Sequence, residues 1–180
     1  MPSENTASQH HLSAATHHER AAHFHREAAT HYLIGKDYAH AAHQALIAQG
    51  HAWHAIDHGN EASKHYADND GAGCLIPSEK ALRLPQKTLD IQGDQPSELS
   101  AAEHHAAAAV HSDQAARHHR LASKHCEDKD YVLAAHEGQI AHNYTKAAIF
   151  HASEAAKNHL DLYGKSELTS NIIDFAATAL

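Results

Sequence analysis

Histidine is the residue type in this chain that could do chemistry, both by its number and by its spacing. The sequence contains 23 histidines in 180 residues. An imidazole nitrogen binds Zn, Cu, Ni and Fe, and it gains or loses a proton near neutral pH. Three histidines near the start, His11, His18 and His25, follow one another at intervals of seven residues. This spacing predicts that they share one face of a helix.

Two His-x-x-Glu motifs offer the most specific candidate metal ligands. His58 and Glu61 form the first motif, and His151 and Glu154 form the second. Residues three apart lie one turn from each other on the same helix face, so each motif can present an imidazole and a carboxylate to one ion. From the turn positions, His58 and Glu61 are expected at the level of His11, and His151 and Glu154 at the level of His104. By the same reasoning His54 is expected to face His18. The strongest predicted ligands are therefore His11, His58, Glu61, His104, His151 and Glu154.

Other histidines close to these positions are further candidates, either as ligands or as hydrogen-bond donors to the ligands. They are His18, His25 and His54, with His111 and His118, which the offset of the repeat described below aligns with the inward positions of His18 and His25. The alternative for each is a polar core layer in which imidazoles bond to water and to one another, because a buried imidazole must satisfy both nitrogens. The adjacent histidines are expected to be solvated: His10, His17, His23, His31, His105, His119 and His142.

A repeat in the sequence explains why the pattern occurs twice. Lys36-Asp37-Tyr38 recurs as Lys129-Asp130-Tyr131, at an offset of 93 residues. The same offset aligns alanines and histidines over about 60 residues, including His11 with His104, so we interpret the chain as containing an internal duplication.

Each copy is predicted to be a helical hairpin that turns near the repeated tripeptide, because small and apolar residues recur at helical period without an internal proline. Helices are predicted over 4–33, 38–67, 98–127 and 131–163, with Ser97 as a candidate N-cap of the third. The predicted fold is all-α, a single-domain four-helix bundle of two antiparallel hairpins (4–67 and 98–163), with a long linker at 68–97 and a short C-terminal helix within 164–180. The C-terminal helix could also join two copies as a homodimer.

The composition predicts an unusual core. Leu, Ile, Val and Phe together contribute only 28 residues, whereas alanine alone contributes 38. Alanine is the strongest helix former, and small residues at every heptad position allow helices to approach closely. The net charge of −8, with the 14 basic residues scattered, offers no basic surface for nucleic acid. Protonation of all 23 histidines would move that charge to +15, so the properties of the protein should depend on pH.

The sequence favours a cytoplasmic protein that does not contact a membrane. No stretch approaches 18 uncharged apolar residues, and the first 30 residues lack the apolar run of a signal peptide. Cys74 and Cys126 stand in unrelated contexts, so a disulfide framework is not indicated, although a single bridge stays open. Cys126 is expected to act as a small buried hydrophobe.

The histidine-rich segments resemble a group of small Ala- and His-rich bacterial proteins that often consist of one helical hairpin. The runs that carry this resemblance are HHERAAHFHREAATHY, GKDYAHAAHQALIAQGHAWHA and HGNEASKHYA. They span both hairpins when their repeats are included, but not the linker or the C-terminal tail. The resemblance implies a helical bacterial protein and no particular activity.

Three hypotheses for function follow from these patterns. The first is a protein that binds Cu, Zn or Ni for buffering, storage or trafficking; iron is less favoured, because di-iron bundles use Glu-x-x-His in the reverse order. The second is a b-type haem held by two imidazoles. The third is a structural or stress-related protein without metal. No nucleophile, phosphate-binding loop or catalytic carboxylate pair stands out, which favours binding over catalysis.

Overall fold

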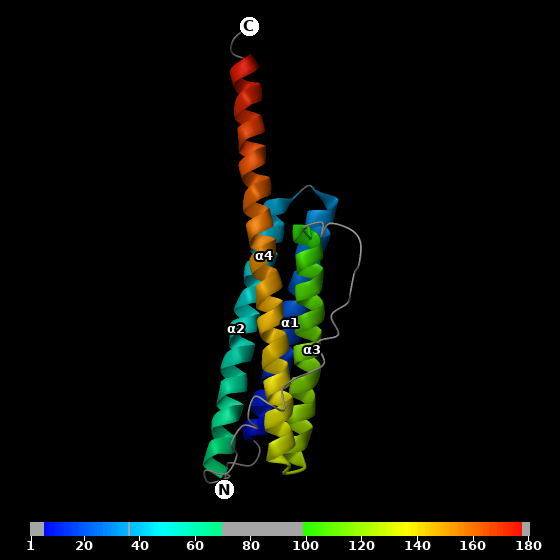
Figure 1. Cartoon of the computed structure of the whole chain (residues 1–180), viewed down its shortest axis with the longest axis vertical. Coiled ribbons are helices and arrows are strands. Elements are labelled where there is room, and N and C mark those ends of the chain that lie inside the picture. The colour runs from blue at the N-terminus through cyan, green and yellow to red at the C-terminus, as the bar shows by residue number, and fades with distance from the viewer. Residues whose placement is uncertain (1–5, 36, 70–98, 178–180) are drawn as a thin grey trace, which may run out of the picture.

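The computed structural model describes residues 6–35, 37–69 and 99–177, without the side chains of 67–69 and 163–177. Within these residues the chain forms four helices and no strand: α1 (Thr6–Ile34), α2 (Tyr38–Asn69), α3 (Ala101–Glu127) and α4 (Tyr131–Ala177). Figure 1 shows them packed lengthwise into a four-helix bundle. The predicted fold class is confirmed.

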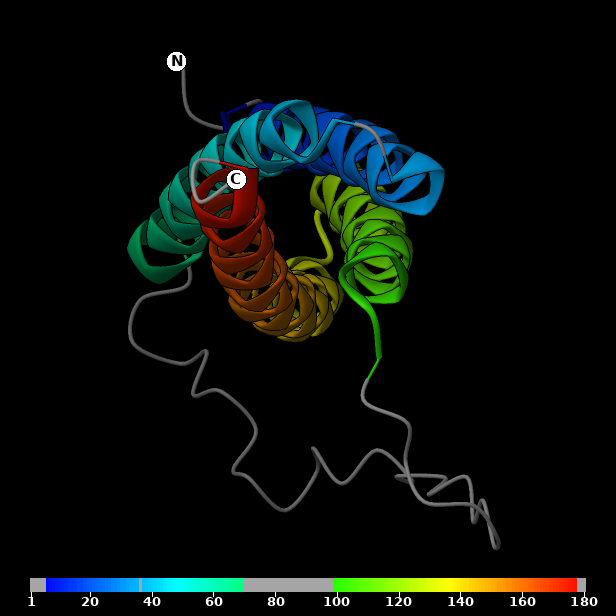
Figure 2. The same cartoon turned by 90° about the horizontal axis from the view of Figure 1, so that it is seen from above.

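The helices form a closed ring in which every neighbour is antiparallel. Helix α1 packs against α2 and α3, and α4 packs against α3 and, less extensively, against α2. The view along the bundle in Figure 2 shows the order α2, α1, α3, α4. Helix α2 ends and α3 begins at opposite ends of the bundle (Figure 1). The predicted linker at 68–97 lies almost wholly outside the described residues, and so does Cys74.

The repeated tripeptide begins the second helix of each hairpin. The carboxylates of Asp37 and Asp130 accept backbone N–H bonds from His40 at 2.9 Å and Leu133 at 3.1 Å, which caps the first turns of α2 and α4. The chain reverses just before them through left-handed residues, Gly35 at φ 70° and Lys129 at φ 62°. The repeat therefore marks the two turns, as predicted.

Helix α3 begins three residues later than predicted, at Ala101. Ser100, and not Ser97, is the N-cap, and it forms a capping box with Glu103. At the other end of the chain, the segment predicted as a separate C-terminal helix is helical to Ala177 but continues α4 without a break. Its side chains beyond 162 lie outside the description, so the predicted dimer contact stays a prediction.

The two hairpins are related by a pseudo-twofold axis perpendicular to the bundle. The ion pair between Arg26 and Asp113 has its counterpart in the ion pair between Arg120 and Glu19. The same relation exchanges the apolar cluster around Tyr32 with the one around Cys126. Equivalent groups therefore lie toward opposite ends of the molecule, and the two sets of predicted ligands cannot merge into one dinuclear site.

The axis also corrects the predicted register. Buried residues of α2 and α4 are related by an offset of 93, as with Ala48 and Ala141, but those of α1 and α3 are related by 94, as with His11 and His105. The second hairpin has one residue fewer between the buried face of its first helix and the capping aspartate. Because one residue turns a helix by about 100°, the predicted inner face of α3 was rotated toward α4.

Small residues fill the core, as the composition predicted. Most fully buried apolar positions are alanine, and the largest fully buried side chains are histidines. Two glycines allow the closest approach: a Cβ added at Gly138 would lie 3.3 Å from Cε1 of His11, and one at Gly59 would lie 3.4 Å from Cε1 of His119. Within the described residues, no helix combines the length and the apolar character needed to cross a membrane.

Candidate metal-binding histidine clusters

Two imidazole pairs lie in the core between α1 and α3. The Nδ1 atoms of His11 and His119 are 3.0 Å apart, and those of His25 and His105 are 3.3 Å apart, so one ring of each pair donates a proton to the other. All four side chains are buried, with exposed fractions of 4% or less. The pseudo-twofold axis exchanges the two pairs. His11 and His25 are therefore inward, as predicted, but their partners are histidines that were expected to be solvated.

The central level of the core is less well satisfied. His18 of α1 and Ser112 of α3 occupy equivalent positions there, and both are buried. Nε2 of His18 lies 3.0 Å from the hydroxyl of Thr145, whereas its Nδ1 and the Ser112 hydroxyl have no hydrogen-bond partner within the described residues. The predicted inward position of His18 is correct.

A buried polar chain extends from one core pair toward α2. Nε2 of His11 bonds to the hydroxyl of Tyr66, which lies 3.2 Å from Sγ of Cys126. Burial raises the pKa of both the Tyr66 phenol and the Cys126 thiol, so these groups hold their protons. Cys126 is free and buried, which agrees with its expected role as a small core residue.

The core imidazoles are held neutral by burial. Desolvation, aided by neighbouring imidazoles, lowers the pKa of His11, His18 and His105 to about 4 and that of His25 to about 3. The pKa of His119 is lowered well below its ordinary value for the same reasons. Protonation of any one of these rings would place a cation in a core of alanine and imidazole.

Outside the core, six imidazoles gather between α1 and α2; we call them the α1–α2 cluster. They are His10, His17, His51, His54, His58 and His65. Nδ1 of His10 lies 3.2 Å from Nδ1 of His58, and the corresponding distance from His17 to His51 is 3.1 Å. His58 also stacks on His17 with ring centroids 5.6 Å apart, so the two pairs are continuous. Five of the six are half-buried and His54 is exposed.

This arrangement corrects the predicted pairing of α1 with α2. His11 and His18 were expected to face His58 and His54, but those contacts are made by His10 and His17, each one residue earlier. His11 and His18 instead point to α3 and α4, because α1 packs against more than one helix. The cluster predicted on α2 is real, but its α1 partners are different residues.

Burial and mutual repulsion lower the pKa of three imidazoles of the α1–α2 cluster, His10, His17 and His51. Burial is the largest cause of the lowered pKa of His10 and His17, followed by the neighbouring imidazoles. For His51, burial comes first and the guanidinium of Arg20 second, and the same guanidinium also lowers the pKa of His17. The carboxylate of Glu61 acts in the opposite direction on His10. Imidazoles that are already neutral compete less with protons for a metal ion.

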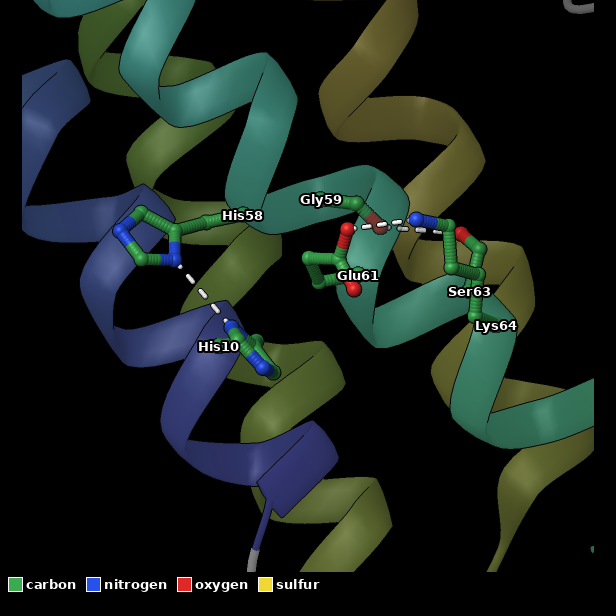
Figure 3. A network of polar contacts seen from close by, with 6 residues as sticks. All are labelled: His10, His58, Gly59, Glu61, Ser63 and Lys64. Carbon is green, nitrogen blue, oxygen red and sulfur yellow. Dashed lines mark hydrogen bonds and ion pairs between the residues drawn. The ribbon is translucent and has the colours of Figure 1, made fainter.

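Neither predicted glutamate contacts an imidazole. Figure 3 shows Glu61 turned away from the His10–His58 pair toward Lys64, with Oε1 2.5 Å from Nζ. Glu154 makes the same contact with Lys157 at 2.5 Å. Each carboxylate finds its partner within its own helix, three residues away. Glu154 does lie near His104 and His151, as expected from the predicted level, and Glu61 lies near His10 rather than His11. The role of both carboxylates as metal ligands stays a prediction.

The second hairpin carries the counterpart of this cluster between α3 and α4; we call it the α3–α4 cluster. Nδ1 of His104 lies 3.0 Å from Nδ1 of His151, which is the twofold equivalent of the His10–His58 pair. His111 stacks on His151 at 5.3 Å and lies 6.0 Å from Tyr144, where the first hairpin has His51. The predicted contact between His104 and His151 is confirmed.

His118 makes a different contact from any in the first hairpin. Its Nδ1 lies 2.6 Å from Oε2 of Glu137, and both side chains are less than a fifth exposed. Its twofold equivalent in α1 is Phe24, which stacks on His51. The expectation that His111 and His118 repeat the inward positions of His18 and His25 is wrong, because those positions in α3 belong to Ser112 and His119.

The imidazole pairs have a spacing close to that of two metal ligands. Two nitrogens at about 2.0–2.1 Å from one tetrahedral ion lie about 3.3–3.4 Å apart, and the five Nδ1 to Nδ1 distances in the bundle are 3.0–3.3 Å. Within the described part of the chain, however, no three His, Cys, Asp or Glu side chains already converge on one point. A third ligand therefore requires a side chain to rotate. No family, curated protein or solved structure matches this chain.

A sequence signal for the correct register was present. The doublet His10-His11 repeats as His104-His105, and Arg26 repeats as Arg120, both at an offset of 94. The repeated tripeptide is more conspicuous and gives an offset of 93 between the two copies. This offset is correct only for the second helix of each hairpin, α2 and α4. Allowing each helix its own offset would have placed His105 and His119 in the core.

Proposed function

We propose that this protein binds transition-metal ions, Cu, Zn or Ni, at the two flanking histidine clusters and buffers, stores or traffics them. The observation that carries this proposal is the twofold-related pair of contacts between His10 and His58 and between His104 and His151, with Nδ1 atoms 3.2 and 3.0 Å apart. Imidazole nitrogens are the preferred ligands of these borderline ions.

The flanks fit metal exchange better than the core does. The α1–α2 cluster is half-buried, so an ion can reach it from solvent, whereas the His11–His119 pair is buried among alanines. Iron is less favoured, because neither Glu61 nor Glu154 contacts an imidazole and carboxylate ligands are needed for a di-iron site. Two ligands from different helices would also fasten each hairpin, since a bound ion stabilises the folded state by mass action.

The haem hypothesis finds no support in the core. The two Nδ1 atoms of each core pair are in hydrogen-bond contact, so no porphyrin fits between them. The structural hypothesis predicts that stability does not respond to metal or chelator. We also infer that the hairpins arose by duplication, which the pseudo-twofold contacts support. The free thiol of Cys126 suits a reducing compartment, so the cytoplasm stays the proposed location.

Equilibrium dialysis of untagged apo-protein against Cu(II), Zn(II) and Ni(II) tests the proposal. We expect at least one tightly bound ion per chain and a marked loss of affinity in the His58→Ala, His151→Ala double variant. The matched control is His43→Ala with His136→Ala, which removes two exposed histidines related by the same twofold axis. Less than one bound ion per chain, or equal binding by the two double variants, would overturn the proposal.

A further inference from the structure

The α1–α2 cluster contains two separate beginnings of a metal site. His10 and His58 form one pair, at 3.2 Å, and His17 and His51 form the other, at 3.1 Å. Each pair supplies two nitrogens at a spacing close to that of tetrahedral ligands. One ion that also binds water needs fewer than four imidazoles. Two four-coordinate ions bound only by protein ligands would need more than four.

Each pair has a third imidazole beside it that can turn inward. The ring of His65 stacks on His10 with centroids 5.7 Å apart, and the ring of His54 lies 5.1 Å from that of His17. His54 is exposed and His65 half-buried, so solvent leaves room for rotation of their side chains. Three imidazoles with one water ligand form a common Zn coordination set, and imidazole equally suits Cu and Ni.

The charges beside the two pairs differ in sign. The carboxylate of Glu61 attracts positive charge at His10 and His65, although its ion pair with Lys64 offsets part of this attraction. The guanidinium of Arg20 lies near His17 and His51 and repels positive charge there. A divalent ion is therefore less disfavoured beside His10 than beside His17, mainly because of Arg20.

We propose that the α1–α2 cluster holds two transition-metal ions in neighbouring subsites, a tighter one at His10, His58 and His65 and a weaker one at His17, His51 and His54. This inference rests on the proposed function. His58 of the tighter subsite stacks on His17 of the weaker one. An ion bound at the tighter subsite therefore places its positive charge close to the weaker subsite. Together with the opposite neighbours Glu61 and Arg20, this separates the two affinities by at least about tenfold.

The second hairpin lacks two of the three histidines that form the weaker subsite in the first. Tyr144 occupies the position of His51, and Ala147 occupies that of His54, so only the subsite at His104 and His151 is left. The equivalent of His65 is Asn158, whose amide donates to the carbonyl of Leu99 at 2.6 Å. The two hairpins therefore differ in capacity, and the first holds the larger share of the bound metal.

The test uses Cu(II) on the full chain carrying His104→Ala and His151→Ala, which removes the imidazole pair of the second hairpin. We expect two Cu(II) per chain by equilibrium dialysis and magnetic coupling between them in the electron paramagnetic resonance spectrum. Adding His17→Ala and His51→Ala should leave one tight ion without coupling. Adding His10→Ala and His65→Ala should leave one weak ion. Helix content by circular dichroism checks that each variant is folded.

A charge substitution tests the subsites without removing a ligand. Arg20→Gln should tighten the weaker ion about tenfold and change the tighter ion less, whereas Arg117→Gln, an exposed arginine on α3, should change neither. One ion that both double variants abolish would overturn the two-subsite inference while leaving metal binding intact. If the unsubstituted protein binds no ion, the proposed function fails as well.

Discussion

At the scale of single residues, the core depends on which imidazole nitrogens have partners. Two of the three buried imidazoles in α1, His11 and His25, bond to a histidine of α3. The third, His18, has Ser112 at the equivalent position of α3 and bonds to Thr145 of α4 instead. The Ser112 hydroxyl is buried without a partner in the described part of the chain, as is Nδ1 of His18. An unpaired buried polar group costs about 1–3 kcal/mol. The level of His18 and Ser112 therefore contributes less to stability than the two imidazole pairs on either side of it.

Two conservative substitutions at this level should have opposite effects. Ser112→Ala removes an unsatisfied hydroxyl, so we expect the free energy of unfolding to rise by up to about 1 kcal/mol. Thr145→Val removes the partner of His18 Nε2 with little change of shape and should lower it by about 1–3 kcal/mol. Urea unfolding at pH 7.5 measures both changes. Destabilisation by Ser112→Ala comparable to that by Thr145→Val would contradict this description of the core.

At the scale of helices, some glycines lie where one helix packs closely against its neighbour and others do not. Gly138 of α4 faces the ring of His11, which Tyr66 and His119 hold in place from its two nitrogens. Gly50 of α2 has no atom within 4 Å of an added Cβ. The two glycines therefore differ in function although both lie within helices.

Alanine substitution should distinguish these two glycines. Gly50→Ala should stabilise the protein by about 1 kcal/mol, because alanine is the better helix former and nothing obstructs its methyl group. Gly138→Ala should give no such gain, and we expect a net loss, since its methyl group would meet the fixed His11 ring at 3.3 Å. Thermal unfolding of the two variants provides the comparison. An equal gain from both substitutions would show that α1 and α4 are less closely packed than described.

Much of the helical architecture was predictable from local signals, whereas side-chain pairing was not. The seven-residue spacing of His11, His18 and His25 placed them inward, as found. The pairing failed for α3, because one residue fewer between its buried face and the capping aspartate rotates that whole face and leaves the repeated tripeptide unchanged. The contact of Glu61 also differs from the prediction, because Lys64, three residues along the same helix, is its partner. Local sequence determines that a helix forms but not how the helix is rotated against its neighbours.

At the scale of the whole molecule, two hairpins are held together by a core of neutral imidazoles. The core rings lie at the α1–α3 contact and bond to one another, to Tyr66 or to Thr145. The charged pairs Arg26–Asp113 and Arg120–Glu19 lie outside this core, and their side chains are 40–55% exposed. Such exposed ion pairs contribute little to the free energy of unfolding. The contact between the hairpins therefore depends mainly on the core, whose imidazoles must stay neutral.

The bundle should therefore lose stability in mild acid. The core pKa values lie below 6.5 in the folded state, so the unfolded chain binds more protons as the pH falls from about 6.5 to about 4. Well above pH 6.5 these imidazoles are neutral in both states and the effect is absent. Each imidazole shifted from 6.5 to about 4 contributes about 3 kcal/mol to the loss. Urea unfolding at pH 7.5, 6.0 and 4.5 should show a steep decrease, and an unchanged free energy of unfolding would contradict it.

Metal binding at the flanking clusters is tested most directly by a crystal structure of the full chain, grown at pH 7.5 with Zn(II) or Cu(II), with anomalous scattering to locate the ions. We expect peaks between His10 and His58 and between His104 and His151, with a further, weaker peak beside His17. Metal found only at exposed histidines such as His43 and His136, with both flanking pairs still hydrogen-bonded directly to each other, would contradict it.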